Sequence, residues 1–152
     1  MKWDIKVYSR RDFAKNVIYG ESREKTLAVC ISDPWDENLN TAANPLILAL
    51  HLFFEDSEDE KGISQTDAER IAEFIKEFIK KNSGHYEKIA VHCDAGVSRS
   101  AGVAAAIAYY LNGSDSQIFD SPRHVPNMRC YRYVLNALFA SEDNIKEAQQ
   151  DV

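Results

Sequence analysis

A cysteine and an arginine, Cys93 and Arg99, stand six positions apart in the stretch VHCDAGVSRS, with only small residues and one aspartate between them. A thiolate is a strong nucleophile, and a guanidinium can bind two oxygens of one phosphate group at once. Gly96 permits backbone conformations that bring amides close to a ligand. The residue types and their spacing therefore predict a loop that binds a phosphate and places a thiolate below the phosphorus atom.

The position of this loop supports the same interpretation. It follows an apolar run that predicts a strand over residues 88–92, and it precedes an apolar segment that predicts a buried helix over residues 99–111. Ligands of α/β sheets gather at the carboxyl ends of strands, and the free amides of a helix N-terminus attract anions. We expect inward-pointing amides in the phosphate loop, which we define as Asp94, Ala95, Gly96, Val97, Ser98 and Arg99. The positive ends of the amide dipoles and the Arg99 guanidinium favour the thiolate form of Cys93 over the thiol.

Two neighbours of the loop are assigned supporting roles. Ser100 can hydrogen-bond the thiolate and ease its later departure. We expect His92 to stabilise the loop by hydrogen bonding rather than to act as an acid or base. No histidine–cysteine pair here has zinc-site spacing, so we expect no metal and no other cofactor. The alternative is a buried cysteine that ends a strand and a surface arginine that caps a loop, but the full string His-Cys-x-x-Gly-x-Ser-Arg-Ser argues against it.

The remaining pattern predicts an α/β fold. Further strands are expected over residues 3–8, 26–32 and 46–54, with Ser9 and Asp12 at a helix start after the first. The predicted architecture is a central, mostly parallel sheet of four to five strands with helices on both faces. The phosphate loop then lies between the last parallel strand and a buried helix.

The clearest helix lies between the third and fourth predicted strands. Thr66 and Glu69 have the spacing of a capping box at its start. Lys80, Lys81 and Gly84 are expected to end it. Its apolar stripe comprises Ile71, Phe74, Ile75, Phe78 and Ile79. A last helix is expected from Asn127 to about Ala140, followed by a frayed polar segment or a separate short helix.

Composition limits the class of protein. The 152 residues fit one domain, which we assign to residues 1–140, with a polar C-terminal extension over residues 141–152. The net charge of -6 argues against nucleic-acid binding and against docking on anionic membranes. The first twelve residues lack the apolar region of a secretory signal, and no apolar run approaches the length of a membrane span. We therefore expect a soluble, cytoplasmic protein of unassigned oligomeric state.

The cysteines fit a reducing compartment. Cys30, Cys93 and Cys130 are widely separated and odd in number, which is typical of free thiols rather than of a disulfide framework. We interpret Cys30 and Cys130 as structural residues of the core. Either of them could form a protective disulfide with an oxidised Cys93 if it lies close enough.

HCDAGVSRS resembles the signature loop of the cysteine-dependent protein tyrosine phosphatases, particularly of their small dual-specificity branch. The segment from Pro122 to the helix after Asn127 is similar to the Pro-x-x-x-Pro-Asn segment of that branch, so Asn127 is expected to support the site. The resemblance spans residues 46–140, whereas the first 45 residues match only in layout. It implies a metal-free phosphocysteine mechanism in which Cys93 is the nucleophile and Arg99 binds the phosphate.

The resemblance also implies a general acid, an aspartate in the loop after the third strand. That loop, FFEDSEDEKG, offers several carboxylates. Asp56 is our choice and Asp59 the second candidate, whereas Glu55 and Glu58 are expected to be solvated. The alternative is that the whole run is a solvated acidic surface. The Trp-Pro-Asp of the larger tyrosine-specific enzymes is missing there, and residues 34–36 (Pro-Trp-Asp) follow the second strand, where we interpret them as a loop that lines the cleft.

Three functions remain open at this point. The first is a phosphatase that acts on phosphotyrosine in proteins, with phosphoserine and phosphothreonine as further substrates, so that the expected partner is a phosphorylated protein. The second is a phosphatase of phosphoinositides or RNA 5′-phosphates, although the loop lacks a lysine for additional phosphates. The third is a catalytically idle phosphate-binding module, against which the presence of both Cys93 and Arg99 argues.

Overall fold

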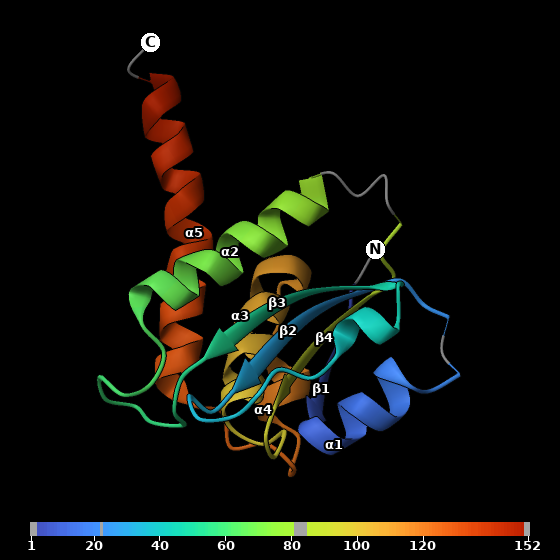
Figure 1. Cartoon of the computed structure of the whole chain (residues 1–152). Helices are drawn as coiled ribbons and strands as arrows, with labels where there is room; N and C mark the ends of the chain where they lie inside the picture. The colour runs from blue at the N-terminus through green and yellow to red at the C-terminus, as the bar shows by residue number, and fades with distance from the viewer. Residues whose placement is uncertain (1–2, 22, 81–84, 151–152) are drawn as a thin grey trace.

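Four parallel strands form one sheet, and their carboxyl ends meet at one edge (Figure 1). The computed structural model describes residues 3–21, 23–80 and 85–150. The strand order is β1-β4-β2-β3, which makes β1 and β3 the outer strands. The strands are β1 (Asp4–Ser9), β2 (Thr26–Ser32), β3 (Ile47–Phe53) and β4 (Lys88–Cys93). The predicted α/β class and parallel sheet are confirmed.

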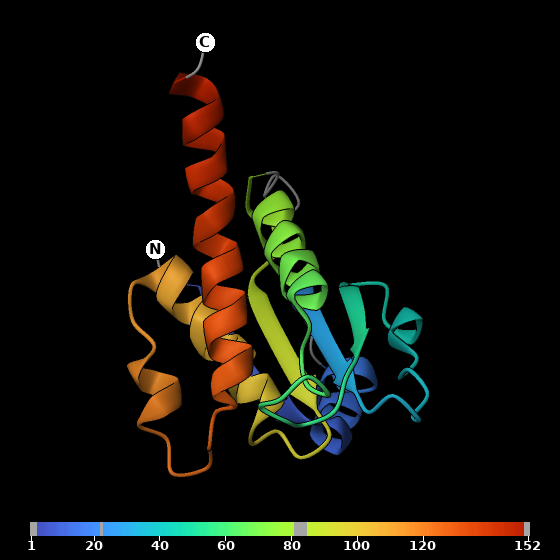
Figure 2. The ribbon, with the colours of Figure 1, turned by 90° about the vertical axis from the view of Figure 1, so that its left-hand side faces the viewer.

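Helices cover both faces of this sheet (Figure 2). One face packs against the three long helices, and the other packs against short helical segments from the first third of the chain. The helical elements are α1 (Arg10–Asp12), the π-helical η1 (Phe13–Ile18), the 3₁₀ turn η2 (Thr41–Ala43), α2 (Gln65–Lys80), α3 (Arg99–Asn112), α4 (Ser116–Phe119) and α5 (Met128–Gln150). Among the described residues, no helix combines the length and the apolar character that a membrane span requires.

The two faces of the sheet carry two separate groups of core residues. Strand side chains alternate between faces, so Val29 and Val91 pack toward the long helices, while Cys30 and Ala90 pack toward η1. Every residue of β2 is buried, as expected for a strand with a neighbour on each side and helices above and below. The buried sheet gives the loops at its carboxyl edge a rigid base.

Local helix signals are partly confirmed. The hydroxyl of Ser9 accepts a hydrogen bond from the Asp12 amide at 3.0 Å and caps α1 as predicted. Gly113 ends α3 with a φ of +77°, close to the end of the helix predicted over residues 99–111. The apolar stripe of α2 faces the core. The predicted end signals Lys81 and Gly84 lie outside the described residues.

Two helix boundaries differ from expectation. The capping box of α2 is formed by Ser64 and Asp67, not by Thr66 and Glu69, because the Ser64 hydroxyl accepts the Asp67 amide at 3.0 Å and Asp67 accepts the Ser64 amide at 3.3 Å. Glu69 instead accepts a hydrogen bond from the Gln65 amide group. Helix α5 continues without a break to Gln150, so the expected end near Ala140 is wrong. The division of domains at residue 140 stays a prediction.

Candidate active site

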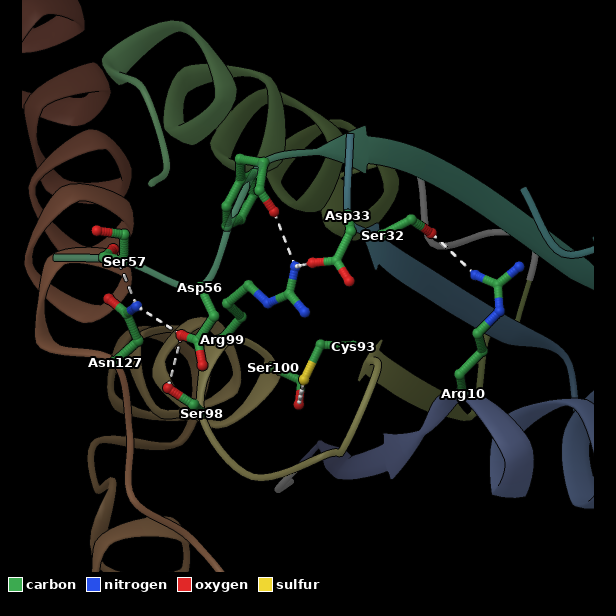
Figure 3. Close-up of polar contacts among 11 residues, drawn as sticks. Arg10, Ser32, Asp33, Asp56, Ser57, Cys93, Ser98, Arg99, Ser100 and Asn127 are labelled. Atoms are coloured by element: carbon green, nitrogen blue, oxygen red, sulfur yellow. Dashed lines mark hydrogen bonds and ion pairs between the residues drawn. The ribbon is translucent and has the colours of Figure 1, made fainter. Parts of the chain in front are cut away.

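The phosphate loop connects the end of β4 to the start of α3 and is fixed against β1 (Figure 3). Gly96 has a φ of +71°, a conformation that side chains disfavour. A Cβ atom at this position would lie 2.5 Å from the Ser9 nitrogen and 2.7 Å from the Tyr8 carbonyl carbon. Glycine is therefore required here both for the turn and for the close approach of the loop to the edge strand.

Three carbonyls of the phosphate loop are bound on its outer side. The carbonyl of Asp94 accepts the Arg10 amide at 3.0 Å, that of Val97 accepts the Val125 amide at 3.0 Å, and that of Ser98 accepts the Asn127 amide at 2.9 Å.

The carbonyl and the next amide of a trans peptide point in opposite directions. The amides of Ala95, Ser98 and Arg99 must therefore point to the inner side of the loop. The arrangement matches the expected anion nest.

Cys93 is the last residue of β4 and is 2% exposed. Its Sγ lies 3.0 Å from the hydroxyl oxygen of Ser100, a fully buried residue in the first turn of α3. The structure thus brings together the two side chains that the sequence paired. A hydroxyl at this distance can donate a hydrogen bond to a thiolate and stabilise its charge.

Arg99 opens α3 and is 4% exposed. One terminal nitrogen, Nη1, donates to Oδ1 of Asp33 and to the carbonyl of Phe54, both at 2.8 Å. The Nε of Arg99 is buried and has no partner among the described residues. Because Nη1 is occupied, the edge formed by Nε and Nη2 remains for a ligand. A buried donor without a partner is costly, and a phosphate on this edge would satisfy it.

Asp56 lies in the loop after β3, and a single one of its oxygens is held. Oδ1 accepts the Ser98 hydroxyl at 2.8 Å and the Asn127 side-chain amide at 3.0 Å. Oδ2 has no hydrogen bond to the described part of the chain. In the view of Figure 3, Arg99 lies between Asp56 and Cys93. The exposed carboxylate of Asp56 is thereby fixed beside the phosphate loop.

Asn127 joins three segments of the site. Besides Asp56, its side-chain amide binds the carbonyl of Ser57 at 3.1 Å, and its Oδ1 accepts the amide of Cys130 at 3.0 Å. Asn127 is 4% exposed, and its bond to the Cys130 amide is buried, whereas its bonds to Asp56 and Ser57 are partly buried. The supporting position that the resemblance implied for Asn127 thus has a geometric basis.

The other acidic residues of this loop shape it rather than face the site. Asp59 accepts the Ser57 hydroxyl at 2.7 Å and the Lys61 amide at 2.9 Å. These hydrogen bonds hold the pKa of Asp59 below its ordinary value, which makes it a poor proton donor. Glu58, expected to be merely solvated, accepts the Met128 amide at 2.9 Å and caps α5. No hydrogen bond is found for the Glu55 side chain within the described residues.

The hydrogen-bonding role of His92 stays a prediction. Neither of its ring nitrogens has a hydrogen-bond partner among the described residues, and the ring stacks on Phe13 at 4.6 Å between centroids. Burial lowers the pKa of His92 to about 4, although the backbone of Cys93 partly opposes the shift. His92 is therefore a neutral residue of the core, and its ring supports the loop by packing against Phe13 of η1.

Asp33 and Arg10 are residues of the site that the sequence did not reveal. Asp33 directly follows β2, and its ion pair with Arg99 joins residues 66 positions apart. Arg10 donates to the hydroxyl of Ser32 at 3.1 Å and to the carbonyl of Glu37 at 2.6 Å, which fixes the loop after β2. The available signal was position, because polar residues that follow parallel strands meet at one edge of the sheet. The Pro-Trp-Asp tripeptide belongs to this same loop.

The two remaining cysteines differ in their relation to Cys93. Burial raises the pKa of Cys30 to about 12, with a small opposing effect of Arg10. Cys30 lies on the η1 face of the sheet and Cys93 on the other, so the suggested disulfide between them is wrong. Cys130 packs on the same face as Cys93, and burial raises the pKa of its thiol as well. Within the described residues, no group of three possible metal ligands is found.

The chain was compared with known proteins. The family profile described as "Dual specificity phosphatase, catalytic domain" matches residues 23–141. A search of curated protein sequences found no match.

Several solved structures share the fold. The Yvh1 phosphatase domain from Chaetomium thermophilum has a TM-score of 0.64 and 17% identity, with 89% of this chain and 90% of that chain covered. The human tyrosine phosphatase-like serine/threonine/tyrosine-interacting protein has a TM-score of 0.61 and 18% identity, with coverage of 86% and 87%. PTPMT1, solved in complex with PI(5)P, has a TM-score of 0.58 and 12% identity, with coverage of 93% and 94%. Because the family profile spans well over half of the chain, this protein belongs to the dual specificity phosphatase family.

Proposed function

We propose that this domain hydrolyses phosphotyrosine in proteins through a phosphocysteine intermediate. One observation carries the proposal: the buried Nε of Arg99 has no hydrogen-bond partner among the described residues, and Arg99 ends a short loop that starts at the buried Cys93. Such an arrangement offers donors for a dianion and one nucleophile. No other part of the described chain offers this combination.

The chemistry proceeds in two balanced steps. In the first, the Cys93 thiolate attacks phosphorus, the bond to the ester oxygen breaks, and Asp56 donates its proton to that leaving oxygen. In the second, water attacks the phosphocysteine, Asp56 takes a proton from the water, and the sulfur–phosphorus bond breaks. Ser100 stabilises the departing thiolate from 3.0 Å. Throughout both steps, Arg99 and the loop amides hold the phosphate oxygens.

The buried position of the nucleophile favours phosphotyrosine over phosphoserine and phosphothreonine as substrate. Cys93 is only 2% exposed, and the long, rigid side chain of phosphotyrosine reaches a recessed sulfur more easily than phosphoserine or phosphothreonine does. The phosphate loop contributes no lysine that could bind the additional phosphates of an inositol lipid. All three cysteines are free thiols, which agrees with the cytoplasmic location that we propose for the domain.

The test is the turnover of a phosphotyrosine peptide by the full chain and by Cys93→Ser. We expect turnover by the full chain, with and without a chelator, and none by the variant. Phosphate-ester binding by the variant should stay within several-fold because Arg99 and the loop amides remain. Appreciable turnover by Cys93→Ser would contradict the covalent mechanism.

Two further substrates separate the other functions. Phosphoserine and phosphothreonine peptides are expected to react more slowly than the phosphotyrosine peptide. Vesicles that contain a phosphoinositide address the lipid alternative, which the fold similarity to PTPMT1 in complex with PI(5)P brings into consideration. Cys93-dependent turnover of the vesicles alone would overturn the proposal in favour of a lipid phosphatase, and binding without any turnover would indicate an idle module.

A further inference from the structure

A groove of about 400 Å³ follows the outer edge of β1, beside the phosphate loop rather than within it. β1 is an end strand of the sheet, so its outer edge has no neighbouring strand. The opposite wall is formed by α4 and the segment that follows it. The side-chain amide of Gln117 bridges the two walls by donating to the carbonyl of Ile5 at 3.1 Å.

The backbone of β1 offers hydrogen-bonding groups to this groove. The N–H and C=O groups of alternate residues in a strand point to opposite sides. Since the Ile5 carbonyl faces Gln117, the N–H and C=O of Val7 face the same outer side. The described residues provide no hydrogen-bond partner for these two groups of Val7. A sheet edge of this kind can pair with an added extended peptide.

Both walls of the groove end on the phosphate loop. On one side, Gly96 lies directly against the backbone of Tyr8 and Ser9 at the end of β1. On the other side, the Val125 amide donates to the carbonyl of Val97 at 3.0 Å. The groove therefore adjoins the phosphate loop at both of its walls, which places it within reach of residues that flank a phosphorylated side chain in the loop.

The charge of the groove selects the kind of peptide. Lys6 and Arg123 both line it, and no carboxylate does, although the chain as a whole has a net charge of -6. Asp4 lies 4.0 Å from the Lys6 ammonium, and no partner is found for the Arg123 guanidinium in the described chain. The lining thus contains two cations, of which Lys6 has an exposed partner outside the lining in Asp4, and this charge favours an acidic ligand.

We propose that this groove binds an extended, acidic segment next to the phosphotyrosine of a protein substrate, paired with the edge of β1. The inference rests on the proposed function, since it assumes a polypeptide substrate at the phosphate loop. Backbone pairing with Val7 supplies affinity that does not depend on sequence, and Lys6 and Arg123 supply the preference for acidic residues.

The first experiment compares phosphotyrosine peptides that differ only in their flanks. Three glutamates are placed before the phosphotyrosine, after it, or replaced by alanines, and kcat/KM is measured at low and high salt. We expect one of the two acidic peptides to exceed the alanine peptide at least about fivefold at low salt, with the advantage falling as salt rises. Methylation of alternate backbone nitrogens in that flank should reduce kcat/KM with a period of two residues, as strand pairing requires.

Charge reversal then assigns the preference to the groove. Arg123→Glu and Lys6→Glu should bring the ratio of kcat/KM between acidic and alanine peptides close to one or below it. Arg70→Glu, an equal change of charge on an exposed residue of α2, should leave the ratio as it is. Turnover of a small aryl phosphate, which has no flank, normalises each variant for the amount of active protein.

The outcomes separate this inference from the proposed function. Equal kcat/KM for all three peptides, or an equal loss of the preference in Arg70→Glu, would contradict peptide binding in the groove. Turnover of the phosphotyrosine peptides would still support the proposed function. A loss of kcat/KM that does not alternate with the position of the N-methyl group would contradict strand pairing with β1. Cys93-dependent turnover of phosphoinositide vesicles without turnover of any phosphopeptide would overturn both.

Discussion

Asp33 and Asp56 both follow strands of the sheet and lie beside Arg99 in Figure 3, but their partners differ in kind. Asp33 binds a guanidinium at 2.8 Å, and its side chain is 20% exposed. Asp56 is exposed and receives only neutral donors, the hydroxyl of Ser98 and the amide of Asn127. The ion pair ties Asp33 to the guanidinium, whereas the neutral donors hold Asp56 through a single oxygen and leave its other oxygen open to a ligand. Asp33 is thus suited to orient Arg99, and Asp56 to transfer protons.

Replacement of Asp56 gives the largest expected separation between the two carboxylates. Asp56→Asn should slow substrates with poor leaving groups by roughly 10²–10⁴-fold, because their leaving oxygen is no longer protonated. An activated phenol as leaving group should be affected much less. The variant should also lose the limb of the pH profile on which activity falls as pH rises, since that limb reports deprotonation of the acid. Steady-state kinetics with a series of aryl phosphates measures both effects.

Asp59→Asn is the matched control for this variant. Asp59 lies in the same loop, but it is fixed by Ser57 and Lys61 in a role that concerns loop shape. Its kinetics should stay close to those of the unaltered chain for all leaving groups. A leaving-group dependence in Asp59→Asn but not in Asp56→Asn would transfer the role of acid to Asp59, and equally mild effects would return the whole loop to a solvated acidic surface.

Replacement of Arg99 tests the group that the two carboxylates flank. Arg99→Lys should reduce kcat/KM by at least about 10²-fold, because one ammonium cannot bind Asp33, the Phe54 carbonyl and two phosphate oxygens together. The loss should be similar for good and poor leaving groups. Inhibition by vanadate gives an independent measure of anion affinity and should weaken in parallel, whereas near-normal kinetics would mean that Nε and Nη2 do not bind the substrate.

Among the three site residues Asp56, Arg99 and Asp33, replacement of Asp33 should have the smallest effect. Asp33→Asn removes the charge but keeps a polar group near Nη1, so we expect a loss of about tenfold in kcat/KM as the guanidinium becomes less firmly oriented. This loss should be the same for good and poor leaving groups. The limb of the pH profile on which activity falls as pH rises should stay unchanged. If Asp33→Asn instead impairs poor leaving groups selectively, then Asp33 takes part in proton transfer and the comparison between the two carboxylates fails.

The contrast between these carboxylates also shows what sequence can predict. Cys93 and Arg99 were found because strand, loop and helix are adjacent in the chain, so that their geometry is a local property. Asp56 was chosen within the loop that the family resemblance implied, because it closely follows the apolar run of the third strand, and its role as acid stays a prediction. Asp33 was missed because its partner is 66 positions away and the order of strands in the sheet, which brings them together, leaves no mark in the sequence.

His92 shows how packing adds to what the sequence predicts. A histidine beside a nucleophile suggested hydrogen bonds, and the structure adds that the residue alternates to the face that η1 covers, where its ring stacks on Phe13. The start of α2 was misplaced, because the capping-box patterns of Ser64–Asp67 and Thr66–Glu69 overlap in the sequence. Ser64 is the residue that caps the helix, and it directly follows the fully buried Ile63. In both cases, packing against a distant segment decided the outcome.

The contact of Gly96 with the backbone of β1 has a consequence for dynamics. β1 is an edge strand with a single strand neighbour, so its hydrogen bonds should open more readily than those of β2 in the middle of the sheet. Because the phosphate loop lies directly on Tyr8 and Ser9, fraying of β1 would release the loop while the remaining strands stay folded. Strand β1, which carries none of the proposed reacting groups, would then set the fraction of molecules able to bind an anion. Hydrogen exchange of its amides would report that fraction.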